Sequence, residues 1–365
     1  MQADIASRQG SLRGLMRRKG VGAMLLTARP NVRYFSGFTG EDSYLLVGQR
    51  WSVLLTDSRF TEQAGKECPS IPALIRTGKM TDAIVKALAG RAVRTLGVEG
   101  AYLPLSLYER LGQALRRVKL KALTGEVDDL RQVKDAGELS AIRKAVRAAE
   151  RALLDLMAGG RTSFVGRSEQ QVAAELEYRM RLRGAERPSF ETIVACGAHA
   201  AMPHYRPGST RIRPNQPVLI DWGAVVGGYC SDLTRVVFTG KIPPRLGRIY
   251  EVVRQAQEKG FAAVKAGVSC EAVDASARDY IVSQGFGEAF GHGLGHGIGL
   301  EIHEAPRLGR RATEPLRAGT VVTIEPGIYL PDVGGVRIED DVLVTETGCK
   351  KLSSLPTELA AMVLH

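Results

Sequence analysis

The sequence predicts an α/β domain followed by an α+β domain that contains an internal duplication with pseudo-two-fold symmetry. In residues 1–130, short apolar runs alternate with helical patterns, as expected for a small α/β domain. A polar stretch then precedes a long helix. Between residues 131 and 365, two helices followed by carboxylate-bearing strands occur twice in the same order. We therefore predict two domains, 1–130 and 131–365.

The composition is that of a globular chain with an ordinary charged surface. The 365 residues are 44% hydrophobic and 24% charged, which is enough for two domains with separate cores. The net charge of +11 arises from dispersed basic residues. We therefore interpret most of this charge as solvated surface and expect no nucleic-acid partner.

The cysteines and the apolar runs argue against two other classes of protein. The five cysteines are odd in number and contain no CxxC pair, which disfavours a disulfide framework and fits a reducing cytoplasm. The N-terminal stretch lacks the apolar segment of a secretion signal, and no apolar run reaches the length of about 18 residues that a membrane span needs. We expect a cytoplasmic protein that does not interact with a membrane.

Local patterns mark the strands and helices of the N-terminal half. The strand-like runs are "GAMLLT" (22–27), "SYLLVG" (43–48) and "WSVLLT" (51–56). The helical patterns lie near 4–19, 58–67, 80–90 and 104–116. This half contains no histidine and no convergent acidic cluster, so its sequence indicates no chemistry.

Capping signals place the helices of the second half. Asp135 and Glu138 form a capping-box pattern that opens a long helix. Ser168 and Gln171 form a second capping box, and Gly184 would end the helix that follows it. Two further helical patterns lie near 245–266 and 270–284.

The first strand pair of the second half brings two aspartates together. In "VLIDWGAVVGGYCSDLTRVVF" (218–238), the Gly227-Gly228 pair predicts a two-residue hairpin turn. With that turn Asp221 pairs with Thr234, diagonal to Asp232, and side-chain alternation places both aspartates on one face. Two carboxylates so close on a half-buried sheet are unfavourable unless a cation or a proton lies between them.

The second half of the duplication repeats this arrangement with Glu325 in "VVTIEPG" and Glu339 in "GVRIEDD". Arg337 shares the face of Glu339 and would orient it. A single such carboxylate is more simply explained as a solvated residue on an open sheet face, but four at duplicated positions are not. If the two hairpins face each other, their charge of −4 matches two divalent cations.

A run rich in glycine and histidine would supply a nitrogen ligand. In "AFGHGLGHGIGLEIHE" (289–304), glycine occupies every second position from Gly291 to Gly299, which excludes a helix because each interior glycine costs about 1 kcal/mol relative to alanine. We predict an extended segment that another backbone or a ligand approaches closely, with His292 and His296 pointing the same way. The alternative is a flexible loop with incidental histidines. A ligand set of mainly oxygen with one nitrogen suits Mn²⁺, with Co²⁺ or Fe²⁺ as substitutes.

Together these motifs resemble the pita-bread metallopeptidases, which include methionine aminopeptidase, aminopeptidase P and prolidase. The family's metal-ligand motifs are matched in order by "IDWGA", "YCSDLTR", "GHGLGHGIGLEIHE", "IEPGIY" and "VRIEDD". "NVRYFSGFTGEDSYLLV" and "LLTDSRFTEQA" are similar to the accessory domain of aminopeptidase P, prolidase and creatinase. The resemblance implies a creatinase-like N-terminal domain, a pita-bread catalytic domain and a homodimer.

The resemblance also implies that five residues bind two metal ions. Asp221 would chelate one ion, His296 and Glu325 would hold the other, and Asp232 and Glu339 would bridge the pair. The ions would be Mn²⁺, with Co²⁺, Fe²⁺ or Zn²⁺ as substitutes. A hydroxide bridging the two ions would be the nucleophile.

Three catalytic histidines follow from the same resemblance, and a fourth catalytic residue, Glu325, follows from the chemistry of a carboxylate beside the bridging water. His303 would contact the substrate carbonyl, and His204 would lie near the leaving-group side. His292 would support them. Glu325 would shuttle a proton in addition to its ligand role.

The predicted function is hydrolysis of the Xaa-Pro bond at the N-terminus of proline-containing peptides, as in aminopeptidase P. The first alternative is a prolidase restricted to Xaa-Pro dipeptides, which needs a group that binds the carboxylate of the dipeptide. The sequence identifies no arginine for that task. A creatinase-type C–N hydrolase and a non-catalytic pita-bread binding module are further alternatives, which the complete ligand set disfavours.

Overall fold

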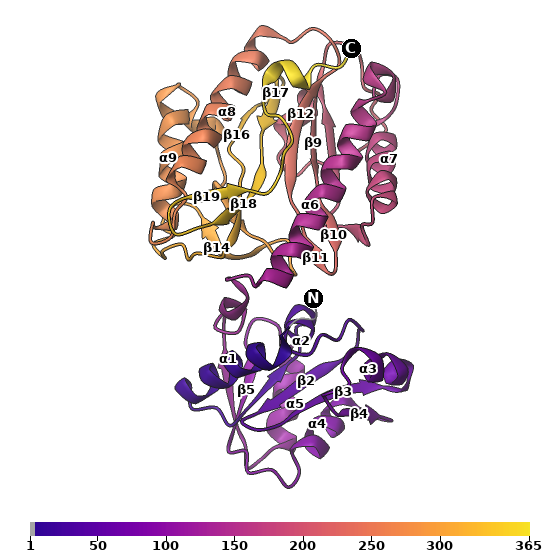
Figure 1. Ribbon diagram of the computed structural model, residues 1–365, viewed down its shortest axis with the longest axis vertical. Coiled ribbons are helices and arrows are strands. Elements are labelled where there is room, and N and C mark those ends of the chain that lie inside the picture. Colours follow the sequence, from indigo (N-terminus) through magenta and orange to yellow (C-terminus); the bar gives the residue numbers. More distant parts are fainter. Residues whose placement is uncertain (1–3) are drawn as a thin grey trace. The chain divides into compact units, whose positions relative to one another are not determined.

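The computed structural model describes residues 4–365, which form two compact units (Figure 1). The first unit ends at Arg131 and the second begins at Gln132. Each unit has its own sheets and its own hydrophobic core.

The first unit is a six-stranded mixed sheet with the strand order β4-β3-β2-β1-β5-β6. Its strands are β1 (Ala23–Leu26), β2 (Tyr44–Gly48), β3 (Ser52–Asp57), β4 (Ala73–Arg76), β5 (Thr95–Glu99) and β6 (Lys119–Leu123). Its helices are α1 (Ile5–Arg18), α2 (Arg29–Ser36), α3 (Thr61–Glu67), α4 (Met80–Leu88) and α5 (Leu105–Ala114). All three predicted strand-like runs form strands, and all four helical patterns form helices.

The second unit has two pairs of helices around a set of strands. The helices are α6 (Ala136–Met157), α7 (Glu169–Leu182), α8 (Pro244–Ala263) and α9 (Cys270–Ser283). Figure 1 shows α6 and α7 on one side of the strands and α8 and α9 on the other. The capping boxes at Asp135 and Ser168 are both present, and Gly184 has a φ of 94° just after α7.

The strands between the helices form two related groups. The first group is β7 (Arg187–Pro188), β8 (Ile193–Cys196), β9 (Pro217–Trp222), β10 (Ala224–Val226), β11 (Tyr229–Cys230) and β12 (Leu233–Phe238). The second group is β13 (Gly295–Gly297), β14 (Glu304–Leu308), β15 (Val321–Ile324), β16 (Gly327–Leu330), β17 (Gly334–Arg337), β18 (Asp340–Val344) and β19 (Cys349–Lys351). The first group forms two sheets with the orders β12-β9-β8 and β11-β10-β7, and the second group forms a sheet with the order β14-β13-β15-β18-β19 and the pair β16-β17.

The first carboxylate hairpin has the predicted register. Gly227 and Gly228 have φ values of 60° and 81°, so both adopt the left-handed conformation that a tight hairpin turn requires. Asp221 pairs with Thr234 across β9 and β12. An antiparallel bridge between Thr234 and Glu339 then joins this hairpin to the second one.

The glycine-rich run is extended over a shorter length than predicted, because only Gly295–Gly297 pairs within a sheet. The predicted close approach of another backbone is confirmed. A Cβ at Gly293, Gly295 or Gly297 would collide with a main-chain carbonyl oxygen of a neighbouring strand. At Gly299 a Cβ would collide with the side chain of Glu304.

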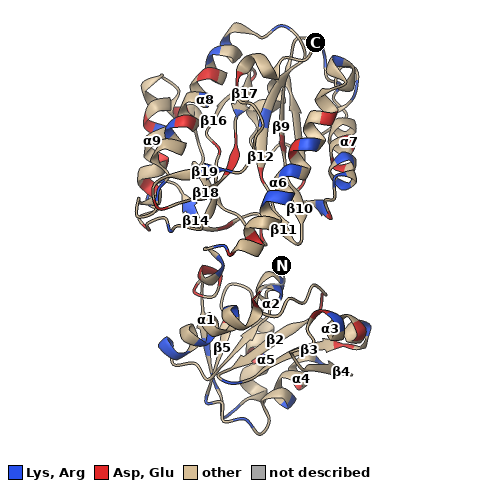
Figure 2. Ribbon diagram, in the orientation of Figure 1, with Lys and Arg blue, Asp and Glu red and all other residues tan. Residues whose placement is uncertain are grey.

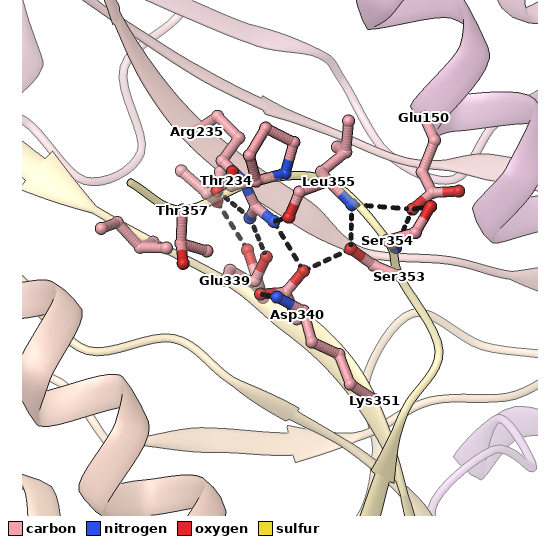
Figure 3. Close-up of polar contacts among 12 residues, drawn as sticks. Glu150, Thr234, Arg235, Glu339, Asp340, Lys351, Ser353, Ser354, Leu355 and Thr357 are labelled. Carbon is pink, nitrogen blue, oxygen red and sulfur yellow. Dashed lines mark hydrogen bonds and ion pairs between the residues drawn. The ribbon is translucent and has the colours of Figure 1, made fainter. Parts of the chain in front are cut away.

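A buried network fixes the C-terminal segment to the strands that carry the acidic residues (Figure 3). The fully buried Arg235 guanidinium on β12 donates to the Asp340 carboxylate at 2.8 Å and to the Glu339 carbonyl at 2.7 Å. It also donates to the carbonyl oxygens of Leu355 and Pro356. The two hairpins and residues 353–357 are therefore joined by one buried hydrogen-bond network.

Charged residues are distributed unevenly in the second unit. Figure 2 shows acidic residues on the central strands, whereas basic residues lie along the outer helix α6. Among residues 4–365, every helix is too short or too polar to cross a lipid bilayer.

Candidate metal and substrate site

One cavity of about 880 Å³ in the second unit is lined by all eight residues that the sequence predicted as metal ligands or catalytic residues. The carboxylates come from the ends and edges of the two hairpins, and the histidines come from the segments around them. The lining residues in question are Asp221, Asp232, Glu325, Glu339, His204, His292, His296 and His303.

Three of these side chains form the tightest group. One ligand atom each from Asp232, His296 and Glu339 lies within 4.8 Å of the others. His296 Nε2 lies 3.6 Å from Asp232 Oδ2 and 3.3 Å from Glu325 Oε1. His296 Nδ1 lies 3.1 Å from the Gly297 carbonyl oxygen, so Nδ1 carries the proton and the Nε2 lone pair faces the carboxylates.

Asp221 is held from the side by an arginine. Its Oδ2 accepts a hydrogen bond from Arg337 Nη2 at 2.5 Å. Its Oδ1 is buried and has no hydrogen-bond partner within the described residues. A buried carboxylate oxygen without a partner is costly, so this atom is a suitable ligand for a cation.

Two threonine hydroxyls orient the glutamates. Thr234 Oγ1 donates to Glu339 Oε2 at 2.6 Å, and Thr323 Oγ1 donates to Glu325 Oε1 at 3.2 Å. Neither threonine was assigned a role at the site from the sequence. Strand alternation was the available signal, because Thr234 shares a face with Asp232 two residues earlier.

The predicted orienting contact between Arg337 and Glu339 is indirect, because it runs through the Thr234 hydroxyl. Arg337 donates to Asp221, to Thr234 Oγ1 at 3.1 Å and to the Tyr329 hydroxyl at 2.7 Å. The cause is that β17, which carries Arg337, packs against β9 and β12 of the first hairpin. Its guanidinium therefore reaches Asp221, and Thr234 takes the place beside Glu339.

The electrostatics of the cavity favour added positive charge. Burial, together with the neighbouring carboxylates, raises the pKa of Asp232 and of Glu339 well above their usual range. Burial raises the pKa of Glu325 to about 8, and it lowers the pKa of His296 to about 3. The closely spaced carboxyl groups hold protons that divalent cations can replace, and the neutral imidazole has a free lone pair for a cation. These residues therefore fit a metal centre.

Comparison with known proteins identifies the family. Residues 140–346 match metallopeptidase family M24, and residues 8–133 match the creatinase/prolidase N-terminal domain. The chain belongs to metallopeptidase family M24. The predicted resemblance and the predicted fold class, a creatinase-like domain followed by a pita-bread domain, are confirmed.

Named relatives of this M24 metallopeptidase cover almost its whole length. An Xaa-Pro dipeptidase of Pyrococcus horikoshii is 38% identical over 345 residues, which is 94% of this chain and 96% of the relative. The structure of an Xaa-Pro dipeptidase from Bacillus anthracis has a TM-score of 0.94 at 36% identity and covers 99% of this chain and 100% of its own. That of an X-Pro aminopeptidase from Thermotoga maritima has a TM-score of 0.91 at 37% identity, with coverages of 98% and 99%.

The cavity of this M24 metallopeptidase also has a basic wall. Besides Arg337, four arginines line it, namely Arg206, Arg307, Arg310 and Arg311. Arg307 on β14 pairs with His296 on β13, so the two side chains lie on the same face of the sheet. His303 packs edge-on against His296 with ring centroids 4.3 Å apart. The His303 imidazole and the Arg307 side chain therefore line the same cavity as the carboxylates.

Proposed function

We propose that this M24 metallopeptidase is an Xaa-Pro dipeptidase, that is, a prolidase. The aminopeptidase P-like function was the first choice from sequence, and prolidase was its alternative. Support for the dipeptidase comes from the names of the Pyrococcus horikoshii and Bacillus anthracis relatives, although the Thermotoga maritima structure is named an aminopeptidase. The position of Arg307 is the structural observation that carries the proposal.

We infer that Arg307 would bind the carboxylate of a dipeptide. Its strand pairing places it beside His296, and it lines the same cavity as the acidic cluster. In a dipeptide the free carboxylate is only one residue from the scissile bond, a span of about 3.5 Å. A guanidinium binds a carboxylate through two parallel hydrogen bonds. In a longer peptide the carboxylate lies farther away, so this contact would favour dipeptides.

The proposed metal ligands are the five residues of the acidic cluster, Asp221, Asp232, His296, Glu325 and Glu339. Two divalent ions, for which we propose Mn²⁺, would supply a nucleophilic water at neutral pH and withdraw charge from the scissile carbonyl. Arg337 fixes Asp221, and the two threonine hydroxyls fix the glutamates, so the ligands are oriented before substrate binds.

Three residues have proposed tasks toward the substrate. Glu325 accepts the proton of the attacking water and returns it to the departing proline nitrogen. His303, beside His296, donates a hydrogen bond to the oxygen of the scissile carbonyl. His204 contacts the proline side of the bond. His292 supports the cavity wall, because its Nε2 lies 2.9 Å from the Tyr329 hydroxyl.

The proposal is tested by substrate length. Metal-free protein is loaded with Mn²⁺ and assayed on an Xaa-Pro dipeptide, on the same dipeptide with an amidated C-terminus and on an Xaa-Pro-Yaa tripeptide. A prolidase cleaves the free dipeptide and loses most of its activity on the amide. Preference for the tripeptide, with no penalty for the amide, would mean that the enzyme is an aminopeptidase P. The resemblance further implies a homodimer, and light scattering of the purified protein would measure the oligomeric state. The five cysteines support a cytoplasmic location.

A further inference from the structure

A buried carboxylate outside the acidic cluster binds the segment that carries His204. Glu169 is the first residue of α7 and has 0% exposure. Its Oε1 accepts hydrogen bonds from the Cys196 main-chain N–H and from His199 Nδ1, both at 2.9 Å. Its Oε2 accepts from the Tyr205 hydroxyl at 2.8 Å and from the Gly208 N–H at 3.2 Å. The four donors come from one continuous stretch of chain.

That stretch, residues 196–208, contributes part of the cavity lining. Pro203, His204 and Tyr205 all line the cavity. The Tyr205 hydroxyl is bound to the buried carboxylate, and the Pro203 carbonyl oxygen accepts a hydrogen bond from Arg337 Nη2 at 3.4 Å. Both chain neighbours of His204 are therefore fixed by hydrogen bonds. Tyr205 is bound to the Glu169 carboxylate, and Pro203 is bound to the arginine that also contacts Asp221.

The carboxylate of Glu169 is charged at neutral pH. Burial acts to raise its pKa, but the hydrogen bonds from Cys196, His199, Tyr205 and Gly208 outweigh burial and lower the pKa below its usual value. Hydrogen bonds to a charged acceptor are about twice as strong as those between neutral groups. The His199 ring also stacks on the Tyr205 ring, with centroids 4.5 Å apart.

A metal ion at this position is a less suitable explanation. Glu169, Cys196 and His199 lie close enough together to hold one. The carboxylate already accepts four hydrogen bonds from protein groups, however. Burial and the adjacent Glu169 raise the pKa of the Cys196 thiol to about 12, so a metal would have to displace a firmly held proton from this thiol.

We propose that Glu169 is a positioning residue for His204. It fixes residues 196–208 so that the imidazole stays on the proline side of the scissile bond. The proposal rests on the proposed function, because that function gives His204 its task. Accurate placement matters, since a displacement of about 1 Å from a reacting group can cost a hundredfold in rate.

Two variants weaken the contact by different amounts. Glu169→Gln keeps the shape of the side chain but turns an N–H₂ group toward the Gly208 N–H or the Tyr205 hydroxyl. Tyr205→Phe removes one hydrogen bond and keeps the ring that stacks on His199. Glu175→Gln is the matched control, because Glu175 lies on the same helix and pairs with Arg179 at 2.7 Å, away from residues 196–208.

The kinetic test is a double-mutant cycle with His204→Ala. We expect Glu169→Gln to lower kcat/KM about ten- to a hundredfold, mainly through kcat, and Tyr205→Phe to lower it less. In the His204→Ala background, Glu169→Gln should cost less than about twofold, because the residue that it positions is absent. Glu175→Gln should match the wild type. Equal losses from Glu169→Gln with and without His204 would overturn the proposal.

A second measurement does not depend on peptidase activity. The imidazole signals of His204 are assigned by NMR through their loss in His204→Ala. Glu169→Gln and Tyr205→Phe should each shift these signals and leave those of His303 in place, whereas Glu175→Gln should shift neither. If Glu169→Gln does not fold, Tyr205→Phe carries this test alone. Unmoved His204 signals would refute the positioning role, whether or not the protein cleaves Xaa-Pro bonds.

Discussion

The Thr234 hydroxyl donates to the Glu339 carboxylate at 2.6 Å and so links the two hairpins at the acidic cluster. An antiparallel bridge connects the same two residues through the main chain. Arg337 Nε reaches the same hydroxyl at 3.1 Å. The spacing between the carboxylates of the two hairpins therefore depends on a residue that is not itself a proposed metal ligand.

Removing this hydroxyl should weaken metal binding. Thr234→Val keeps the shape of the side chain but removes the buried partner of Glu339 Oε2 and of Arg337 Nε. We expect a loss of about 1–3 kcal/mol in the free energy of unfolding and about ten- to a hundredfold in Mn²⁺ affinity. Calorimetric titration of metal-free protein measures the affinity. Thr234→Ser is the control and should retain it, and wild-type affinity in Thr234→Val would contradict the assigned role.

Glu325→Gln should abolish most of the turnover. The amide cannot accept a proton from the attacking water, so we expect kcat to fall about 10²- to 10⁴-fold. The metal content of the purified variant must be measured alongside, because Glu325 is also a proposed ligand. Near-normal turnover in a metal-loaded variant would show that another residue moves the proton.

Arg307 should determine the preference for dipeptides. Arg307→Met removes the guanidinium and keeps much of the length of the side chain. We expect kcat/KM for an Xaa-Pro dipeptide to fall about ten- to a hundredfold, the worth of a charged hydrogen bond. Cleavage of the amidated dipeptide should change little, because its C-terminus is neutral. An equal loss on both substrates would indicate a structural role for Arg307.

The stability of metal-free protein should fall as the pH rises. Burial raises the pKa of Glu325 to about 8, whereas an unfolded glutamate titrates near pH 4.3, so the folded state binds this proton more tightly. The contribution of the Glu325 proton to the free energy of unfolding is complete below about pH 4.3. It decreases as the pH rises and is lost above about pH 8.

This dependence is measured by thermal unfolding of metal-free wild type and metal-free Glu325→Gln between pH 5 and pH 8.5. The quantity compared is the difference between their unfolding temperatures at each pH. The wild type should lose stability relative to the variant as the pH increases, and Mn²⁺ should restore it. A difference that does not change with pH would mean that Glu325 is ionised in the folded metal-free protein.

Local signals in the sequence were enough to predict the first hairpin and the close packing of the glycine run. Gly227-Gly228 allows a two-residue turn, and that turn alone sets the pairing of Asp221 with Thr234. A Cβ at Gly295 would collide with the Thr323 carbonyl oxygen, so the alternating glycines reflect a real backbone contact. The eight candidate residues line one cavity, and their individual roles stay a prediction.

The elements that the sequence analysis missed have weak local patterns. Helix α2 has only eight residues, β4 is a partly exposed strand at the sheet edge, and β6 alternates lysine with apolar residues. The contacts that orient the site are nonlocal. Thr234 and Glu339 are 105 positions apart, and no pattern within a single segment predicts their hydrogen bond.

The central claim is that the carboxylates of the two hairpins jointly hold two divalent ions. The most direct measurement is anomalous diffraction from crystals of the protein loaded with Mn²⁺. We expect two anomalous peaks in the cavity, both in contact with Asp232 and Glu339, one of them also with Asp221 and the other with His296 and Glu325. Absence of peaks at these carboxylates in Mn²⁺-saturated crystals would contradict the account.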